Sequence, residues 1–166
     1  SLVGSEMCIR DRYELNLPNR VGKPAALPGE IANALNIQPK EVYKARDYLL
    51  VYQSQTEIET LKIERSIFDQ INIDPGGVIV TAVGKDSDFV SRFFTPQASI
   101  LEDPVTGSSH CTLIPYWFKR LQKKEMNAQQ LSKRGGKIGC IYKGSRVQIN
   151  GAALTVSESV LIRDFD

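Results

Sequence analysis

The junction between a turn-rich segment and one long helical pattern constrains this fold more than any other feature of the chain. The segment is Glu102-Asp-Pro-Val-Thr-Gly-Ser-Ser-His-Cys111, and the helix predicted with it covers about residues 107–124. Apolar residues at helical spacing give this helix a broad face, so we expect it to be well buried. Pro115 inside the helix lacks an N–H group, which removes one backbone hydrogen bond and predicts a kink.

The other segments alternate strand patterns with shorter helices, which indicates a mixture of α and β elements. Strands are predicted at residues 13–17, 78–83 and 89–94, and the segment 42–53 fits two strands or one bent strand. Short helices are predicted from Pro28 and across residues 63–71. Three closing strands are predicted at residues 138–142, 145–149 and 154–161, with hinges at Gly144 and Gly151.

Composition and charge favour a single soluble domain. The 166 residues suffice for one domain with a real core, and a net charge of +2 gives no reason to expect nucleic acid or a membrane surface as partner. The sequence holds no apolar run long enough to span a membrane. Three cysteines without paired or metal-ligand spacing, together with a single histidine, predict a reduced, cytoplasmic protein without a metal site.

The first twelve residues do not fit the pattern that follows them. The segment SLVGSEMCIRDR has neither a sustained period nor turn chemistry, and it meets the strand pattern at Tyr13 without a linker. It resembles a translated sequencing adapter, which is left out of fold reasoning. A natural disordered extension is the alternative. On the adapter interpretation, we expect the natural protein to continue upstream of Tyr13.

The start of the long helix is a candidate anion-binding site with a carboxylate beside it. A helix N-terminus presents free backbone N–H groups and a partial positive charge, so it attracts a carboxylate. Asp103 would then lie within reach of the α-carbon of the bound molecule, as proton transfer requires. Asp103 could instead cap the helix or brace the Pro104 turn, and His110 could be catalytic or only pack against a neighbouring loop.

Two other reactive arrangements in this segment are disfavoured. A Ser108-His110-Asp103 triad is not expected, because residues so close in sequence seldom converge with the required orientation. Cys111 lies one turn inside the helix, where a buried structural thiol is the favoured interpretation.

Two arginines and a glycine pair are further candidates for substrate contact. Arg92 and Arg134 could contact an acidic substrate, although either could equally be solvated or paired with Glu102. Gly135-Gly136 permits a tight turn or a close backbone approach. The pair lacks the strand and helix context of a phosphate-binding loop.

Four motifs follow one another in a recognisable order along the chain. They are Asp88-Phe-Val-Ser-Arg-Phe-Phe-Thr-Pro96, the turn-rich segment 102–111 with Pro115-Tyr-Trp117 after it, Gln130-Leu-Ser-Lys-Arg-Gly-Gly136 and Gly144-Ser-Arg-Val-Gln-Ile-Asn-Gly151. In this order they resemble the C-terminal half of the PhzF-like family, the phenazine-biosynthesis isomerases. The resemblance covers essentially all of residues 13–166.

This resemblance implies an α+β fold of the diaminopimelate-epimerase type, in which a mixed β-barrel or sheet wraps around a central helix. Family members have two similar domains with the active site in the cleft between them. Residues 13–166 would be the C-terminal domain, and the N-terminal domain, which carries the principal general acid/base glutamate of the family, would be largely missing. The chemistry of the family is proton transfer near a carboxylate without a cofactor.

The candidate site residues come from the resemblance together with the residues themselves. The catalytic candidates are Asp103, which the resemblance also indicates, and His110. The candidate substrate contacts at the N-terminal end of the helix, called the helix mouth below, are Gly107, Ser108 and Ser109. Arg134 and Gly135, further along the chain, are the other two candidate contacts. No cysteine directly precedes Gly107, so the two-cysteine chemistry of related epimerases and racemases is not expected.

Three interpretations of function follow. The favoured one is a cofactor-independent isomerase that acts on a small carboxylate-containing metabolite, with this chain supplying half of the inter-domain active site. The alternatives are a non-catalytic carboxylate-binding module and an inactive fragment whose unpaired inter-domain face would favour self-association. A homodimer is a further candidate assembly.

Overall fold

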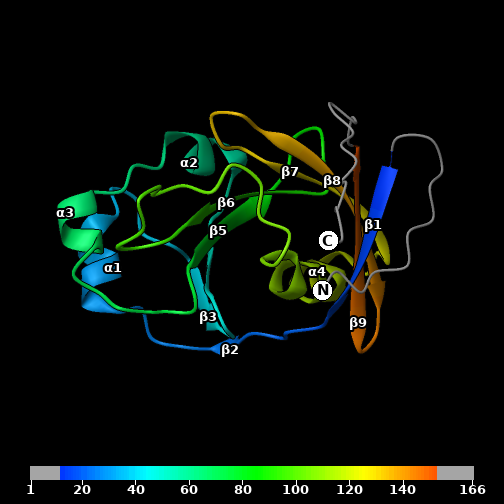
Figure 1. Cartoon of the computed structure of the whole chain (residues 1–166), viewed down its shortest axis with the longest axis horizontal. Helices are drawn as coiled ribbons and strands as arrows, with labels where there is room; N and C mark the ends of the chain where they lie inside the picture. Colours follow the sequence, from blue (N-terminus) through cyan, green and yellow to red (C-terminus); the bar gives the residue numbers. More distant parts are fainter. Residues whose placement is uncertain (1–11, 153–166) are drawn as a thin grey trace, which may run out of the picture.

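A computed structural model describes residues 12–152, and these form one nine-stranded sheet that curves around a central helix, α4 (His110–Leu121) (Figure 1). The strands are neighbours in the order β1-β9-β8-β7-β6-β5-β4-β3-β2. The pairs β4/β5 and β6/β7 are parallel, and the other neighbouring pairs are antiparallel. The strand bounds are β1 (Arg12–Pro18), β2 (Lys23–Pro24), β3 (Glu41–Lys44), β4 (Tyr48–Val51), β5 (Val78–Val83), β6 (Phe89–Phe94), β7 (Glu125–Gln130), β8 (Gly136–Lys143) and β9 (Arg146–Ala152).

Three short helices lie on the side of the central strands away from α4 (Figure 1). They are α1 (Gly29–Ala34), α2 (Gln55–Thr60) and α3 (Arg65–Phe68). Because both faces of the central strands are covered, their side chains alternate between two cores. Ile79 belongs to the core around α4, whereas Val78 and Val80 belong to the core beneath the short helices. Burial on both faces explains the unbroken apolar run of β5.

The central helix continues through Pro115 because a neighbouring loop replaces the lost backbone contact. A proline at this position offers no N–H to the carbonyl of Cys111, four residues earlier. The backbone N–H of Arg20 donates to that carbonyl at 2.8 Å instead. The helix is followed by Gln122, which has a left-handed φ of 54° and donates its N–H to the carbonyl of Phe118.

Most elements agree with the sequence prediction, but the short strand β2, helix α2 and strand β7 were missed. The segment 42–53 contains the two strands β3 and β4, and the second predicted helix is the short α3. The missed helix α2 begins with a capping box. The Ser54 side chain accepts from the Glu57 N–H, and the Glu57 carboxylate accepts from the backbone N–H of Ser54. The missed strand β7 is rich in amide side chains and has only Met126 and Ala128 as apolar residues, so its alternation is weak.

The long helix is shorter than predicted, and two closing strands are confirmed. Helix α4 begins at His110, because residues 107–109 form a tight turn in which the His110 N–H donates to the Gly107 carbonyl. Strands β8 and β9 meet at Gly144, whose φ is +73°, whereas Gly151 lies inside β9 and is not a hinge. The predicted strand 154–161 and residues 1–11 lie outside the described residues.

The described part of the chain gives no sign of a membrane-spanning helix or of a metal site. None of the helices within residues 12–152 is both long enough and apolar enough to cross a membrane. Over the same residues, the structure contains no group of three or more histidine, cysteine, aspartate or glutamate side chains placed to hold a metal ion.

Candidate active site at the mouth of the central helix

The loop between β6 and α4 carries the candidate site, and an ion pair ties the middle of that loop to β6. Glu102 accepts from Nε and Nη2 of Arg92 at 2.7 and 2.9 Å. The remaining Nη1 of Arg92 donates to two backbone carbonyls at the end of α2. Arg92 is therefore engaged within the protein, and the structure shows the pairing with Glu102 rather than an arginine free for substrate.

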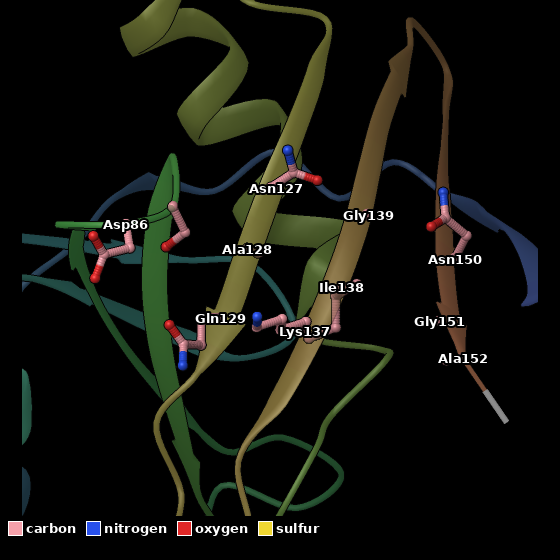
Figure 2. A pocket seen from close by; sticks show the side chains of 11 residues that line it. Asp86, Asn127, Ala128, Gln129, Lys137, Ile138, Gly139, Asn150, Gly151 and Ala152 are labelled. Atoms are coloured by element: carbon pink, nitrogen blue, oxygen red, sulfur yellow. The ribbon is translucent and has the colours of Figure 1, made fainter.

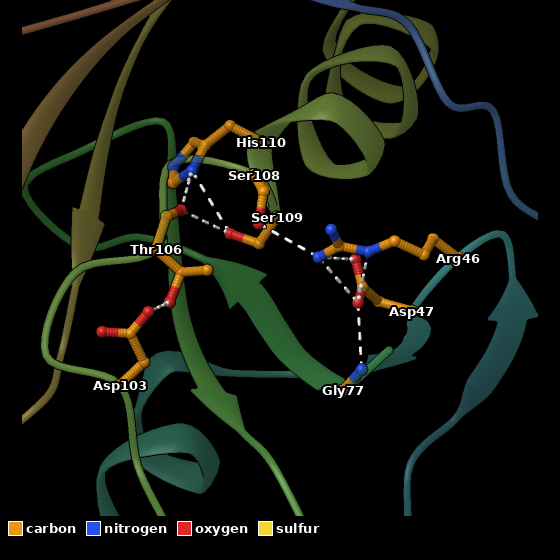
Figure 3. Close-up of polar contacts among 8 residues, drawn as sticks. All are labelled: Arg46, Asp47, Gly77, Asp103, Thr106, Ser108, Ser109 and His110. Atoms are coloured by element: carbon orange, nitrogen blue, oxygen red, sulfur yellow. Dashed lines mark hydrogen bonds and ion pairs between the residues drawn. The ribbon is translucent and has the colours of Figure 1, made fainter. Parts of the chain in front are cut away.

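Asp103 lies beside the helix mouth with one carboxylate oxygen already bonded (Figure 3). The Thr106 hydroxyl donates to its Oδ2 at 2.7 Å, and its backbone N–H donates to the carbonyl of Phe93 at 3.0 Å. Among the described residues, Oδ1 of Asp103 has no hydrogen-bond partner. The carboxylate thus braces the Pro104 turn and does not cap α4, and one oxygen stays available for another molecule.

His110 is buried beneath the mouth and cannot touch a substrate there. Its side chain has 0% exposure, and its Nδ1 lies 2.9 Å from the carbonyl of Thr106. Because a carbonyl only accepts, Nδ1 must carry the proton, which leaves Nε2 as a buried acceptor without a partner among the described residues. Burial lowers the pKa of His110 to about 4, so the ring is neutral near pH 7. The geometry supports packing and bonding of the neighbouring loop, the plainer of the two predicted roles.

Ser108 faces an arginine that comes from the turn between β3 and β4 (Figure 3). Nη2 of Arg46 donates to Oγ of Ser108 at 3.0 Å. The guanidinium is held by Asp47, whose side chain is fully buried and also accepts from the N–H of Gly77 at 3.0 Å. The mouth therefore has a carboxylate, Asp103, on one side and a fixed positive charge, Arg46, on the other.

Two other residues at the start of α4, Ser109 and Cys111, are buried. Ser109 is 1% exposed, and its hydroxyl donates to the carbonyl of Thr106 at 2.8 Å. Cys111 is also buried, and burial raises the pKa of its thiol despite the opposing charges of Arg20 and Arg46. A protonated, enclosed thiol is a poor nucleophile, in agreement with the structural role predicted for it.

A hollow opens beside the mouth where the sheet curves around the start of α4. Its cavity volume is about 560 Å³, and it brings together three of the predicted contact residues, Gly107, Arg134 and Gly135. Gly135 has a φ of +71°, and its N–H donates to Oγ of Ser132, which in turn donates to the carbonyl of Pro104. The glycine turn is thereby tied to the loop that carries Asp103.

A second hollow lies on the outer face of the same strands (Figure 2). It has a volume of about 420 Å³, and polar side chains line it, among them Asn127 and Gln129 of β7, Lys137 of β8 and Asn150 of β9. These residues alternate with inward-facing ones such as Met126 and Ala128, which belong to the core around α4. This hollow adjoins the one beside the helix mouth, since both are lined by Lys137 and Ile138 of β8 and by residues 150–152 of β9.

The sequence analysis missed three residues of the site, Thr106, Gln130 and Arg46. Gln130 is 1% exposed and bonds both Thr106 and Asp103. Gln130 is a polar residue at an inward-facing position of a strand, which would have marked it as a candidate. The sequence analysis did not predict β7, so this position was not recognised as inward-facing. Arg46 comes from a turn distant in sequence, so only the fold brings it to Ser108.

Comparison with known proteins identifies the family. Residues 21–159 match the PhzC-PhzF family, described as phenazine biosynthesis-like protein. The chain is 43% identical over 148 residues to an uncharacterized isomerase of Pseudomonas aeruginosa and 40% identical over 153 residues to one of Halalkalibacterium halodurans. The structure of a PhzF-family phenazine biosynthesis protein from Enterococcus faecalis superposes with a TM-score of 0.84 at 37% identity. The chain belongs to the PhzC-PhzF family, and its fold is the α+β, diaminopimelate-epimerase-like fold that the motifs implied.

The chain spans little more than half the length of these relatives. The aligned regions cover 89% and 90% of this chain but 56% and 57% of the two curated isomerases. The superposition on the Enterococcus faecalis structure covers 92% of this chain and 58% of that one.

Proposed function

We propose that this chain supplies half of the active site of a cofactor-independent isomerase that moves a proton on a small substrate with a carboxylate group. Membership in a family whose relatives are named isomerases supports the reaction type. The observation that carries the proposal is the mouth of α4, where Asp103 lies on one side and Ser108, bonded to Arg46, on the other.

The roles follow from what each group offers. Backbone N–H groups of Gly107 and Ser108 at the start of a helix would bind the substrate carboxylate, and Arg46 would add positive charge beside it. Asp103, with Oδ1 available, would act on a proton of the neighbouring carbon. Arg134 and Gly135, at the rim of the adjacent hollow, would contact the rest of the substrate. His110 would act only through the loop that it holds.

A second domain is part of the proposal. Isomerisation by proton transfer needs a base that removes a proton from one carbon and an acid that returns a proton, and Asp103 is the carboxylate at this mouth with an unbonded oxygen. The relatives are nearly twice as long as the matched region, which is in line with residues 13–166 acting as one domain of two. We place the partner base in that other domain.

Two measurements test the proposal. In a ¹H–¹⁵N NMR titration of the chain with benzoate, we expect saturable shifts of the Gly107 and Ser108 amides that weaken several-fold in Arg46→Gln but not in Arg65→Gln, a distant exposed arginine. In D₂O, C–H exchange on small carboxylic acids is expected only when the chain is combined with the upstream half of the Pseudomonas aeruginosa relative.

The outcomes separate the alternatives. Exchange of equal rate from the chain alone would contradict a half-site. Benzoate binding at the mouth without exchange in any combination would favour a non-catalytic carboxylate-binding module. Absence of benzoate binding at the mouth would favour the third interpretation, an inactive fragment.

A further inference from the structure

Thr106 links the loop together, because each of its polar atoms has a hydrogen-bond partner. Its N–H donates to Oε1 of Gln130 at 2.8 Å, and its carbonyl accepts from Ser109 and His110 at 2.8 and 2.9 Å. Its hydroxyl donates to Oδ2 of Asp103 at 2.7 Å. Thr106 is 5% exposed and Gln130 is 1% exposed, so water does not compete for these contacts.

The side-chain amide of Gln130 can adopt only one orientation, and that orientation directs the Thr106 hydroxyl. With the Thr106 N–H at Oε1, Nε2 must face the carbonyl of Asp103 at 2.6 Å, because the flipped amide would bring two donors together. Nε2 also lies 3.4 Å from Oγ1 of Thr106 and presents a second hydrogen to that oxygen. The hydroxyl proton is therefore left to point at the carboxylate of Asp103.

We propose that Thr106 and Gln130 are positioning residues that hold Asp103 in one rotamer, occupy its Oδ2 and leave Oδ1 as the oxygen that meets the substrate. This inference rests on the role proposed above for Asp103. Neither residue touches the substrate, and both act through Asp103. A group that moves a proton must be held within hydrogen-bond reach of it, so free rotation of Asp103 would reduce the fraction of productive geometry.

Replacement of the hydroxyl tests the inference without any need to know the substrate. In the labelled 166-residue chain, the two Hα–Hβ couplings of Asp103 report its χ1 rotamer. We expect the wild type to show the couplings of a single staggered rotamer, either one large and one small or two small ones. Thr106→Val keeps the shape but lacks the donor, and it should give two intermediate couplings. Thr106→Ser keeps the donor and should restore the wild-type pattern.

Thr81→Val is the matched control for lost stability. Thr81 is fully buried, its hydroxyl donates to the carbonyl of Val90, and it accepts from Nε1 of Trp117. Its loss should lower thermal stability as Thr106→Val does, yet leave the Asp103 couplings unchanged. Should Thr106→Val fail to fold, Gln130→Met, which removes the amide and keeps the length, is expected to average the couplings in the same way.

The results distinguish this inference from the proposed function. Wild-type couplings in Thr106→Val, or in Gln130→Met where that variant decides, would overturn the inference even with benzoate binding intact. The variants could show averaged couplings while the wild-type chain binds no benzoate at the mouth. That combination would support the positioning role and count against the proposed function alone.

Discussion

At the scale of single residues, buried polar groups organise this site more than exposed ones do. Asp47 is fully buried yet fixes Arg46, and His110 is fully buried yet fixes Thr106. A buried polar group without its partner is costly, so such residues restrict the loops around them to one arrangement. These buried polar groups hold in place the groups that remain available to a ligand, Oδ1 of Asp103 and the backbone of the helix mouth.

His110 gives a pH dependence with a defined sign. Its folded pKa of about 4 lies below the ordinary value of 6.5, so the unfolded chain binds the proton more readily. Its stabilising contribution is complete above pH 6.5 and is lost as the pH falls toward 4, by about 3 kcal/mol in total. We expect urea unfolding from pH 7 to pH 4 to show this loss in the wild type and a flatter profile in His110→Asn. Parallel profiles for the two proteins would contradict the assignment.

At the scale of elements, β7 and β8 serve as a platform for the active-site loop. Gln130 ends β7, the loop after it contributes Ser132, and Gly136 begins β8 against Val105 of the active-site loop. The sequence predicted β8 but not β7, because three of the six residues of β7 are amides and none is β-branched. Periodicity reveals which face of an element is apolar, but not which polar side chain will be enclosed by a strand from elsewhere.

Gly136 tests this platform. A Cβ added there would lie 2.5 Å from Cγ2 of Val105, so the active-site loop would have to shift. We expect Gly136→Ala to lower the free energy of unfolding by about 1–3 kcal/mol and to displace the amide signal of Gly107. Gly29→Ala is the control, since nothing lies within 4 Å of its added Cβ, and its effect should stay within about 0.5 kcal/mol. Equal effects of the two substitutions, by urea unfolding and ¹H–¹⁵N spectra, would show that β8 does not hold the loop.

At the scale of the whole molecule, the sheet encloses α4 along its length but leaves the hollow at its N-terminal mouth open. The family motifs predicted the fold class and the helix, because these motifs lie on contiguous segments. They did not predict Arg46 beside Ser108, which depends on strand order across the sheet. Tyr13 and Leu15 line the open hollow and are 45% and 44% exposed. Apolar side chains at such a rim favour burial against another surface.

We therefore expect the 166-residue chain to associate with itself through this rim. Leu15→Lys places a charge in the hollow and should weaken association at least several-fold, since burial of an unpaired charge opposes the contact. Val83→Lys is the matched control, because Val83 is a comparably exposed apolar residue, at 50%, that does not line the hollow. Sedimentation equilibrium over a concentration series measures both variants. An association constant that Leu15→Lys leaves unchanged, or that Val83→Lys lowers equally, would show that the mouth of the sheet is not the contact surface.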